Sequence, residues 1–411
     1  QANAHDAYFA NPFYTAGQMA PVYPYLMHNE DGSVATDGTG NSYDISNYDY
    51  LGGRNIIYEI QNDISRKERN AVSGQIYGTI SFLKDFAATV RGDLYNVNNT
   101  EKRPSITPIA VTVLLTTAVF QKVHDRTREY RFTQELTWAH DFDKHHIDVL
   151  LAHESFKHSY NYDFMMKEQM KVSGNTEMSN FAKMTSIDGY NQEYTTESYL
   201  SRARYNFAER YFLDASFRRD GSSRFSDPWG NFWSLGASWI ISQEKFMKDL
   251  TWIDNLKFRV SYGEVGNDAG ADYYAYKELF YSDVNAGIGA FYKIQIPNKN
   301  LKWETSGSLD IALEGRLFNR FNFSLDFFNK TSKDLLFTVY NPLSAGATDW
   351  FATSDETPSG MSQYFANIGS VRNTGLEVAM DVDAIRTKDW KWNIGLNLTT
   401  IHNETYKVAR R

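Results

Sequence analysis

Residues 309–328 decide the fold. They read Leu309-Asp-Ile-Ala-Leu-Glu-Gly-Arg-Leu-Phe-Asn-Arg-Phe-Asn-Phe-Ser-Leu-Asp-Phe-Phe328. Apolar and polar residues alternate along two segments, and a very short turn joins the segments. Because successive side chains of a β-strand point to opposite sides, each segment is predicted to be a strand with one apolar and one polar face. Together they predict a β-hairpin.

The same two-segment unit occurs six times, and each time a short polar link joins its strands. The predicted strand pairs are 76–82 with 86–94, 130–138 with 146–152, 199–207 with 211–218, 232–241 with 256–262, 308–317 with 321–328, and 375–383 with 391–399. Weaker strand patterns lie at 111–120, 272–281, 288–296 and 335–340. The sequence therefore predicts an all-β protein.

The links between successive hairpins are of another kind. Residues 95–129, 153–198, 263–307 and 329–374 are rich in Gly, Asn, Asp, Ser and Tyr, and we expect long loops there. Tight turns at one end of a sheet and long loops at the other are typical of outer-membrane barrels. A soluble β-sandwich seldom contains loops of this length. The pattern favours a transmembrane antiparallel up-and-down β-barrel.

The alternation also predicts which side chains face which way, because a shift of one residue would exchange the two faces. We expect one set to face outward toward lipid: Leu309, Leu313, Phe323, Phe327, Leu376 and Trp392. We expect a second set to face the interior: Asp310, Glu314, Arg316, Asp326, Glu377 and Asp381.

Composition agrees with this prediction. Apolar residues make up 42% of the chain, and no stretch is long enough for a membrane-spanning helix. The aromatic content is 15%, and rings near strand ends are typical of the girdles at a membrane interface. These rings are Trp138, Phe142, Tyr199, Phe207, Tyr211, Trp233, Trp239, Trp390 and Trp392. The net charge of −8 argues against a nucleic-acid partner.

Several segments carry a family resemblance. The later segments are Asn300-Leu-Lys-Trp-Glu-Thr305, Phe327-Phe-Asn-Lys-Thr-Ser-Lys-Asp-Leu-Leu336 and Asn367-Ile-Gly-Ser-Val-Arg-Asn-Thr-Gly-Leu-Glu377. Earlier ones are Asn11-Pro-Phe-Tyr-Thr-Ala16, Pro21-Val-Tyr-Pro-Tyr25, Tyr211-Phe-Leu-Asp-Ala-Ser-Phe-Arg-Arg-Asp-Gly-Ser-Ser-Arg-Phe225, Trp233-Ser-Leu-Gly-Ala-Ser-Trp239 and Leu256-Lys-Phe-Arg-Val-Ser-Tyr-Gly263. In this order, over nearly the whole chain, they resemble SusC/RagA-type TonB-dependent transporters.

The resemblance implies an outer-membrane importer of a Gram-negative bacterium of the Bacteroidota, with a barrel of 22 strands and an internal plug. It implies a SusD-like surface lipoprotein as a lid, and oligosaccharides or oligopeptides as substrates. Energy would reach the plug from the TonB-ExbB-ExbD system. No enzyme activity and no cofactor are implied.

We expect the chain to be part of such a protein. Residues 1–70 form a loop-rich lead-in and residues 71–411 the barrel hairpins, so that 1–411 is a partial barrel and the plug and TonB box are absent from it. The predicted strands fall short of 22, and a sheet with two open edges in lipid is not viable. We therefore expect other residues to close the barrel.

Motifs for bond chemistry or metal binding are weak. His153 and His158 are too far apart for a zinc-protease helix and lie in a strand-like segment. The segment Asp31-Gly-Ser-Val-Ala-Thr-Asp-Gly38 lacks the closing Glu of a calcium loop and favours a turn. The methionines of one predicted loop lack interleaved His or Cys, so we expect loop packing and no metal site. These are Met165, Met166, Met170, Met178 and Met184.

Aromatic residues of the predicted loops are the candidates for substrate binding, since their rings offer apolar faces and polar tips to sugars or peptides. The candidates are Tyr160, Tyr162, Tyr273, Tyr274, Trp350 and Tyr364. Packing within the loops, or contact with the lid protein, is the alternative role.

Two other functions share the alternation. A passive porin-type barrel, or a barrel-shaped adhesin, needs no plug. A secreted glycan-binding β-protein would bury the apolar face in a soluble core. The sequence favours the barrel portion of an importer whose work is binding and gated passage.

Overall fold

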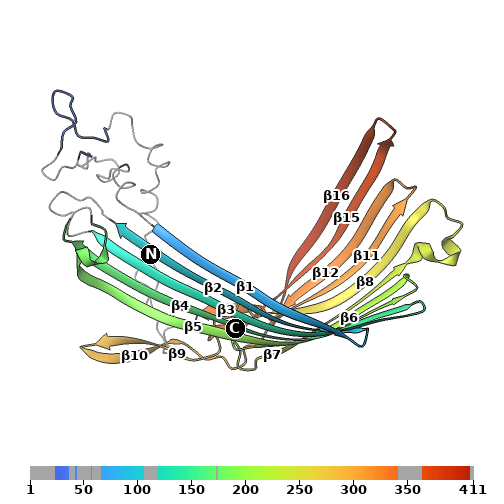
Figure 1. The fold of residues 1–411 in the computed structure, drawn as a ribbon, viewed down its shortest axis with the longest axis horizontal. Coiled ribbons are helices and arrows are strands. Elements are labelled where there is room, and N and C mark those ends of the chain that lie inside the picture. Colours follow the sequence, from blue (N-terminus) through green and yellow to red (C-terminus); the bar gives the residue numbers. More distant parts are fainter. Residues whose placement is uncertain are drawn as a thin grey trace. The chain divides into compact units, whose positions relative to one another are not determined.

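The computed structural model describes residues 24–36, 42–43, 57, 66–105, 118–172, 175–340 and 363–407. In these residues strands dominate (Figure 1). The short 3₁₀ helices are η2 (Met178–Asn180), η3 (Ile241–Gln243) and η4 (Lys245–Met247). No helix of the described residues is long and apolar enough to cross a membrane.

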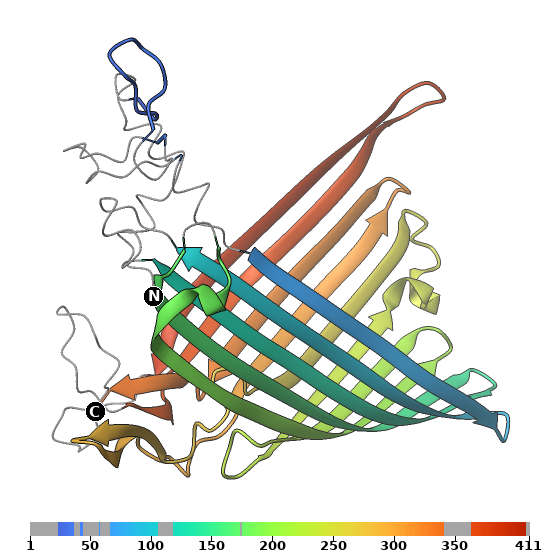
Figure 2. The same cartoon turned by 60° about the vertical axis from the view of Figure 1, so that its left-hand side comes forward.

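Twelve strands form one large sheet in the order in which they follow along the chain, with β9, β10, β13 and β14 left out. Its strands are β1 (Arg66–Phe82), β2 (Phe86–Ser105), β3 (Val119–Phe142), β4 (His145–Met170), β5 (Phe181–Phe207), β6 (Tyr211–Ser222), β7 (Trp229–Ile240), β8 (Ile253–Asn267), β11 (Glu304–Leu317), β12 (Phe321–Lys333), β15 (Ser370–Arg386) and β16 (Lys391–Lys407). The pairings from β5 to β16 are antiparallel. Figure 2 shows β11, β12, β15 and β16 side by side. This topology confirms the six predicted hairpins.

A second, four-stranded sheet has the order β13-β14-β10-β9. Its strands are β9 (Leu279–Asn285), β10 (Ile288–Gln295), β13 (Leu336–Tyr340) and β14 (Gln363–Asn367). The weak patterns at 288–296 and 335–340 are therefore strands. The pattern at 272–281 is wrong in position, because residues 268–278 form turns and bends and β9 starts only at Leu279. Of the pattern at 111–120, residues 111–117 lie outside the described residues.

The strands are longer than predicted, and two predicted loops are wrong. The segment 153–198 is mostly the continuation of β4 to Met170 and the start of β5 at Phe181. In 95–129, β2 continues to Ser105 and β3 starts at Val119. The extensions of β2, β3 and β5 are mostly polar on both faces and escape hydrophobic alternation. The extension of β4 does alternate, with Tyr160, Tyr162 and Phe164 at every second position, but the prediction assigned these residues to a loop.

Three hairpin turns share one backbone conformation. The first two turn residues adopt positive φ at 83–84, 208–209 and 318–319, and none of these residues is glycine. The turns also continue the hydrogen bonding to neighbouring strands: Ala208 N–H donates to the Lys144 carbonyl at 2.7 Å, and Ile240 N–H donates to the Arg210 carbonyl at 2.9 Å. Left-handed backbone costs a non-glycine residue about 1 kcal/mol, and these extra hydrogen bonds offset that cost.

The chain divides into two compact units. The first contains residues 1–74, 94–129 and 159–192, and the second contains residues 75–93, 130–158 and 193–411. The first unit has a small core, to which two of the five methionines contribute: Phe120, Phe181, Met170 and Met178 pack together with Ala118. The surfaces and pockets described next belong to the second unit.

A second small core lies among the connections of the second unit, which we call the loop core. It consists of Phe225, Ala271, Ala275, Leu301, Leu336 and Phe365, with Tyr276 and Trp303 packed against it. These residues come from five separate parts of the chain, so the loop core holds connections that are far apart in sequence in one fixed arrangement.

Candidate functional site

The register of the large sheet separates two faces. Leu313, Leu325 and Val378 lie opposite one another on neighbouring strands, and the adjacent row contains Glu314, Ser324 and Ala379. Extending the pairing places all six residues predicted to face outward on one side, the apolar face, and all six predicted to face inward on the other, the polar face. The predicted separation of the two sets is confirmed.

The apolar face carries two belts of rings. Near the short turns, neighbouring ring centroids are 4.7 to 6.5 Å apart. This turn-side belt contains Phe82, Phe86, Trp138, His140, Phe142, His145, Phe207, Tyr211, Trp239 and Phe246. Farther from the short turns, a second group contains His153, Tyr199, Trp229, Trp233 and Tyr262.

The separation of the belts suits a bilayer. On β5, Tyr199 and Phe207 are eight residues apart, which corresponds to roughly 26 Å along the strand and, for a strand tilted by about 40°, to roughly 20 Å across the membrane. The lipid-facing band of an outer-membrane barrel is about 25 Å tall and has a girdle at each border. The apolar face therefore has the surface that an outer membrane requires.

Charged side chains on the polar face are largely paired across strands. Arg259 Nε donates to Glu314 at 2.7 Å, and its Nη2 donates to Asp326 on the next strand. Asp381 accepts from Asn322 and from Asn393, both at 2.9 Å. Such a polar, hydrogen-bonded surface is typical of the lumen of a barrel.

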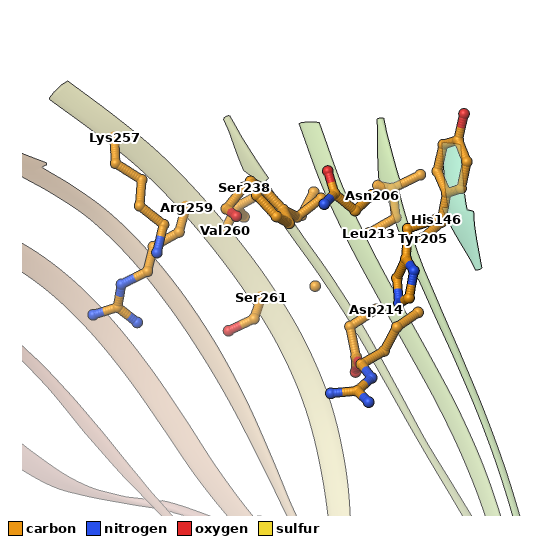
Figure 3. Close-up of a pocket in the computed structure, with 14 residues that line it drawn as sticks. His146, Tyr205, Asn206, Leu213, Asp214, Ser238, Lys257, Arg259, Val260 and Ser261 are labelled. Atoms are coloured by element: carbon orange, nitrogen blue, oxygen red, sulfur yellow. The ribbon is translucent and has the colours of Figure 1, made fainter. Parts of the chain in front are cut away.

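The polar face has hollows. One of about 440 Å³ lies over β4 to β8 and is lined among others by His146, Asp214, Arg259 and Ser261. In Figure 3, His146 and Tyr205 point in opposite directions, in line with the two faces. Another hollow, of about 800 Å³, lies over β11, β12, β15 and β16, where Ser324, Ala379 and Gly395 leave space between larger polar side chains.

A third hollow, the loop-side pocket, has a volume of about 500 Å³. Its polar lining includes an ion pair, in which Arg218 Nε donates to both carboxylate oxygens of Asp220 at 2.6 and 2.8 Å. Arg218 Nη2 also donates to Ser198 at 3.2 Å. Asp220 and Ser198 are buried, whereas 46% of the Arg218 side chain is exposed. The guanidinium group is therefore fixed and accessible.

Small residues, which leave space, and two aromatic rings shape the rest of this pocket. Ser216 and Ser234 hydroxyls are 2.6 Å apart, and at Gly263 a Cβ would lie 3.0 Å from the Ser234 Cβ. The Phe232 ring packs edge-on against Trp303, with centroids 5.6 Å apart. A Cβ at Gly266 would lie 2.0 Å from the Phe232 ring, so glycine is needed for the ring to lie there.

Residues Asp268–Lys277, which follow β8, lie across the polar face, and we call them the strap. Tyr273 Oη is 3.0 Å from His158 Nε2 on β4, and its ring is 5.5 Å from that of Tyr194 on β5. The Tyr274 hydroxyl accepts a hydrogen bond from the Glu193 N–H at 3.4 Å. The strap thus reaches from β8 over β7 and β6 to β5 and β4.

Two features fix the strap. Ala271 and Ala275 are buried in the loop core. Gln295 on β10 is 2% exposed, and its Nε2 donates to the carbonyls of Tyr274, Ala275 and Lys277. Asp268, at the start of the strap, accepts from Ser222 at 2.7 Å and lines the loop-side pocket.

The described residues among the predicted binding residues lie on separate elements. Tyr160 and Tyr162 lie on β4, not in a loop, and both rings contact Tyr190 of the first unit. Tyr273 and Tyr274 are in the strap. Tyr364 lies on β14 opposite Val339, and Trp350 lies outside the described residues. Their role in binding stays a prediction.

The structure also places the weak metal motifs. His153 stacks on Tyr199 of the apolar face, whereas His158 stacks on Tyr194 of the polar face, so the two rings cannot share an ion. Asp31 accepts two hydrogen bonds from Ser33, which hold the pKa of this carboxyl below its usual value and form a turn. The described residues contain no cluster of three or more His, Cys, Asp or Glu suited to a metal ion.

Sequence reasoning missed Arg218, Asp220, Ser198 and Trp303. Arg218 and Asp220 are part of a segment that carries the family resemblance, and Trp303 of another, but neither was assigned a function. Arg218 and Asp220 are two residues apart near the end of a strand, and this spacing predicts only that they share a face. Trp303 and the strap lie close to this pair only in the folded protein, so the alternation of residues along the sequence cannot predict that they do.

The fold and the two-faced wall are those of an outer-membrane β-barrel. The family model "TonB dependent receptor-like, beta-barrel" matches residues 9–409, and the chain belongs to this family. It is of the SusC/RagA type and its location is the outer membrane.

Among similar proteins is TonB-dependent receptor P39 of Formosa agariphila, 36% identical over 219 residues, which is 52% of this chain and 19% of that protein. TonB-dependent receptor SusC of Bacteroides thetaiotaomicron is 32% identical over 239 residues, 56% of this chain and 22% of that protein. The solved structure of the RagAB peptide transporter superposes with a TM-score of 0.76 at 21% identity, covering 90% of this chain and 40% of that one. The sequence matches therefore cover less than a quarter of P39 and of SusC, and the structural match covers 40% of the RagAB chain.

Proposed function

We propose that this chain is the barrel portion of an active importer of the SusC type, which takes up oligosaccharides or oligopeptides. The observation that carries the proposal is the two-faced wall: an apolar face with belts of rings and a polar face with hollows, one of which is bordered by a fixed strap. A SusD-like lipoprotein closes the outside, and TonB-ExbB-ExbD supplies energy through a plug. The names of the similar proteins, SusC and the RagAB peptide transporter, support this assignment.

The chain contributes no bond chemistry to this process. Its paired charges and hydroxyls replace part of the water around a polar solute, and the strap narrows the passage at the loop end. Selective passage then depends on differential binding and on movement of the plug.

Uptake by cells that produce the full-length protein tests the proposal. We expect accumulation of an oligosaccharide or oligopeptide from a mixed panel, and we expect a protonophore or deletion of TonB to abolish it. Accumulation that persists without the proton gradient would instead indicate a passive porin-type barrel. Recovery of the protein in detergent-free buffer would indicate the secreted glycan-binding protein.

A further inference from the structure

We propose that the loop-side pocket is a binding subsite for an uncharged sugar unit of the transported molecule. This inference rests on the proposed function and deepens it by naming a place and a ligand class. The subsite comprises the Arg218–Asp220 pair, the hydroxyls of Ser198, Ser216 and Ser234, and Trp303.

The charges of the pocket argue for a neutral ligand. Among the described residues that line it, Arg218 is the one basic residue, and its Nε donates to both carboxylate oxygens of Asp220. The other two carboxylates of the lining also accept hydrogen bonds, Glu264 from Tyr262 at 2.9 Å and Asp268 from Ser222 at 2.7 Å. An anionic ligand would therefore meet three carboxylates, and a cationic ligand would have to take one of them from its hydrogen-bond donor. Displacing either partner of this ion pair costs a charge-assisted hydrogen bond of about 1.5–3 kcal/mol. A neutral ligand leaves the pair intact.

The hydrogen-bonding groups of the pocket suit hydroxyls. A serine hydroxyl both donates and accepts, the guanidinium group donates, and the carboxylate accepts. A sugar presents the same mixture of donors and acceptors at close spacing. The Arg218 side chain is 46% exposed while its Nε and Nη2 are held by Asp220 and Ser198. Ordering it for a ligand therefore costs little entropy.

Apolar surface completes the subsite. Leu200 and Phe232 lie opposite Arg218 on the neighbouring strands, and Trp303, the residue before β11, packs against Phe232. Such surfaces suit the C–H faces of a sugar ring. The volume of about 500 Å³ lies within the range of small-ligand sites.

The strap fixes one border of the loop-side pocket. Asp268 lines the pocket, and its carboxylate is held by Ser222. The Arg224 guanidinium donates to the Asp268 carbonyl at 3.0 Å and stands 4.1 Å from the Tyr194 ring centroid. One border of the pocket is thereby fixed to β5 before any ligand arrives.

Calorimetric titration of the purified full-length transporter tests the subsite, with short neutral gluco-, manno- and xylo-oligosaccharides, uronic-acid oligosaccharides and short peptides as probes. The decisive pair of variants is Arg218→Met and Arg219→Met. Both remove one arginine from the same strand, but Arg219 stands over Trp229 on the apolar face, 4.9 Å from the ring centroid.

We expect at least one neutral oligosaccharide to bind and Arg218→Met to weaken its affinity by about tenfold or more. Arg219→Met should leave the affinity unchanged. Since Arg218→Met leaves Asp220 without its partner, Ser198→Ala and Ser234→Ala provide a second test without a charge change, with losses of about fivefold each. The heat-dependent shift in gel mobility of each variant verifies the folded barrel.

Equal affinities of Arg218→Met and Arg219→Met would overturn the subsite. Binding of peptides or uronic-acid oligosaccharides in place of neutral ones, with loss in Arg218→Met, would overturn the ligand class, and so would binding of no probe. Measuring uptake by cells distinguishes a failure of the subsite from a failure of the proposed importer function. Energy-dependent uptake with equal affinities refutes the subsite alone, whereas binding that depends on Arg218 without energy-dependent uptake refutes the importer alone.

Discussion

The carboxylate of Glu244 accepts a hydrogen bond from the Tyr211 hydroxyl at 2.6 Å. Glu244 also accepts from Trp239 Nε1 at 3.1 Å and pairs with Arg210 at 3.2 Å. It lies between η3 and η4, outside the strands, and Tyr211 and Trp239 belong to the turn-side belt. A single carboxylate therefore connects the long turn after β7 to two rings of the apolar face.

We expect Glu244→Gln to reveal an acid-sensitive contribution to stability. The hydrogen bond from Tyr211, and then those from Trp239 and Arg210, lower the pKa of Glu244 below its usual 4.5. A lowered pKa in the folded state stabilises the fold above the unfolded-state pKa, and this contribution disappears as the pH falls through the folded-state value. Thermal unfolding in detergent should show a wild-type advantage at neutral pH that shrinks below about pH 4.5. An advantage that does not change with pH would contradict the prediction.

The two faces can be tested with neighbouring residues on β12. We expect Leu325→Arg to destabilise the folded protein in lipid by about 2–4 kcal/mol, because it places a charge on the lipid side of the wall. Ser324→Arg, the matched control, places the same side chain in a polar hollow and should cost far less. Urea unfolding in phospholipid vesicles measures both. A larger loss for Ser324→Arg would reverse the assignment of the faces.

A tight approach of strands at Gly375 leads to a further prediction. A Cβ there would lie 2.1 Å from the Thr400 carbonyl oxygen and 2.5 Å from the Phe328 ring. Since the carbonyl belongs to the ladder between β15 and β16, it cannot simply move aside, and we expect Gly375→Ala to cost about 1–3 kcal/mol. At Gly236 the nearest atom is 3.7 Å away, so Gly236→Ala should be tolerated. Equal unfolding midpoints for the two variants would refute the prediction.

The turn between β5 and β6 should gain stability from glycine. Ala208 has a φ of 54°, so we expect Ala208→Gly to relieve backbone strain and stabilise by up to about 1 kcal/mol. Ala215→Gly, in extended backbone on β6, should destabilise by roughly 0.5–1 kcal/mol. Chemical unfolding of both variants checks the opposite signs. Destabilisation by Ala208→Gly would mean that unfolded-state entropy exceeds the strain.

Alternation predicted the hairpins and the two faces because both follow from the geometry of a strand between lipid and water. It predicted Leu376 and Glu377 on opposite sides, and the register agrees. It failed beyond the apolar band, where β5 continues with mostly polar residues and where the alternating Tyr160, Tyr162 and Phe164 of β4 were assigned to a loop. The loop-side pocket was missed because Arg218 and Asp220 do not differ in the sequence from other charged residues of the polar face. Only the structure shows that Trp303 and the strap lie beside them.

The amide of Gln295 connects β10 to three carbonyls of a segment about twenty residues earlier in the chain. Further side-chain amides join other connections, since Asn298 donates to the Phe365 carbonyl and Asn367 to those of Lys302 and Asp334. An insertion or a graft in any one of these connections therefore disturbs the others. A relative that evolves to transport a different substrate would therefore have to exchange these segments together, as a cassette. Engineering a change of substrate should likewise replace them together.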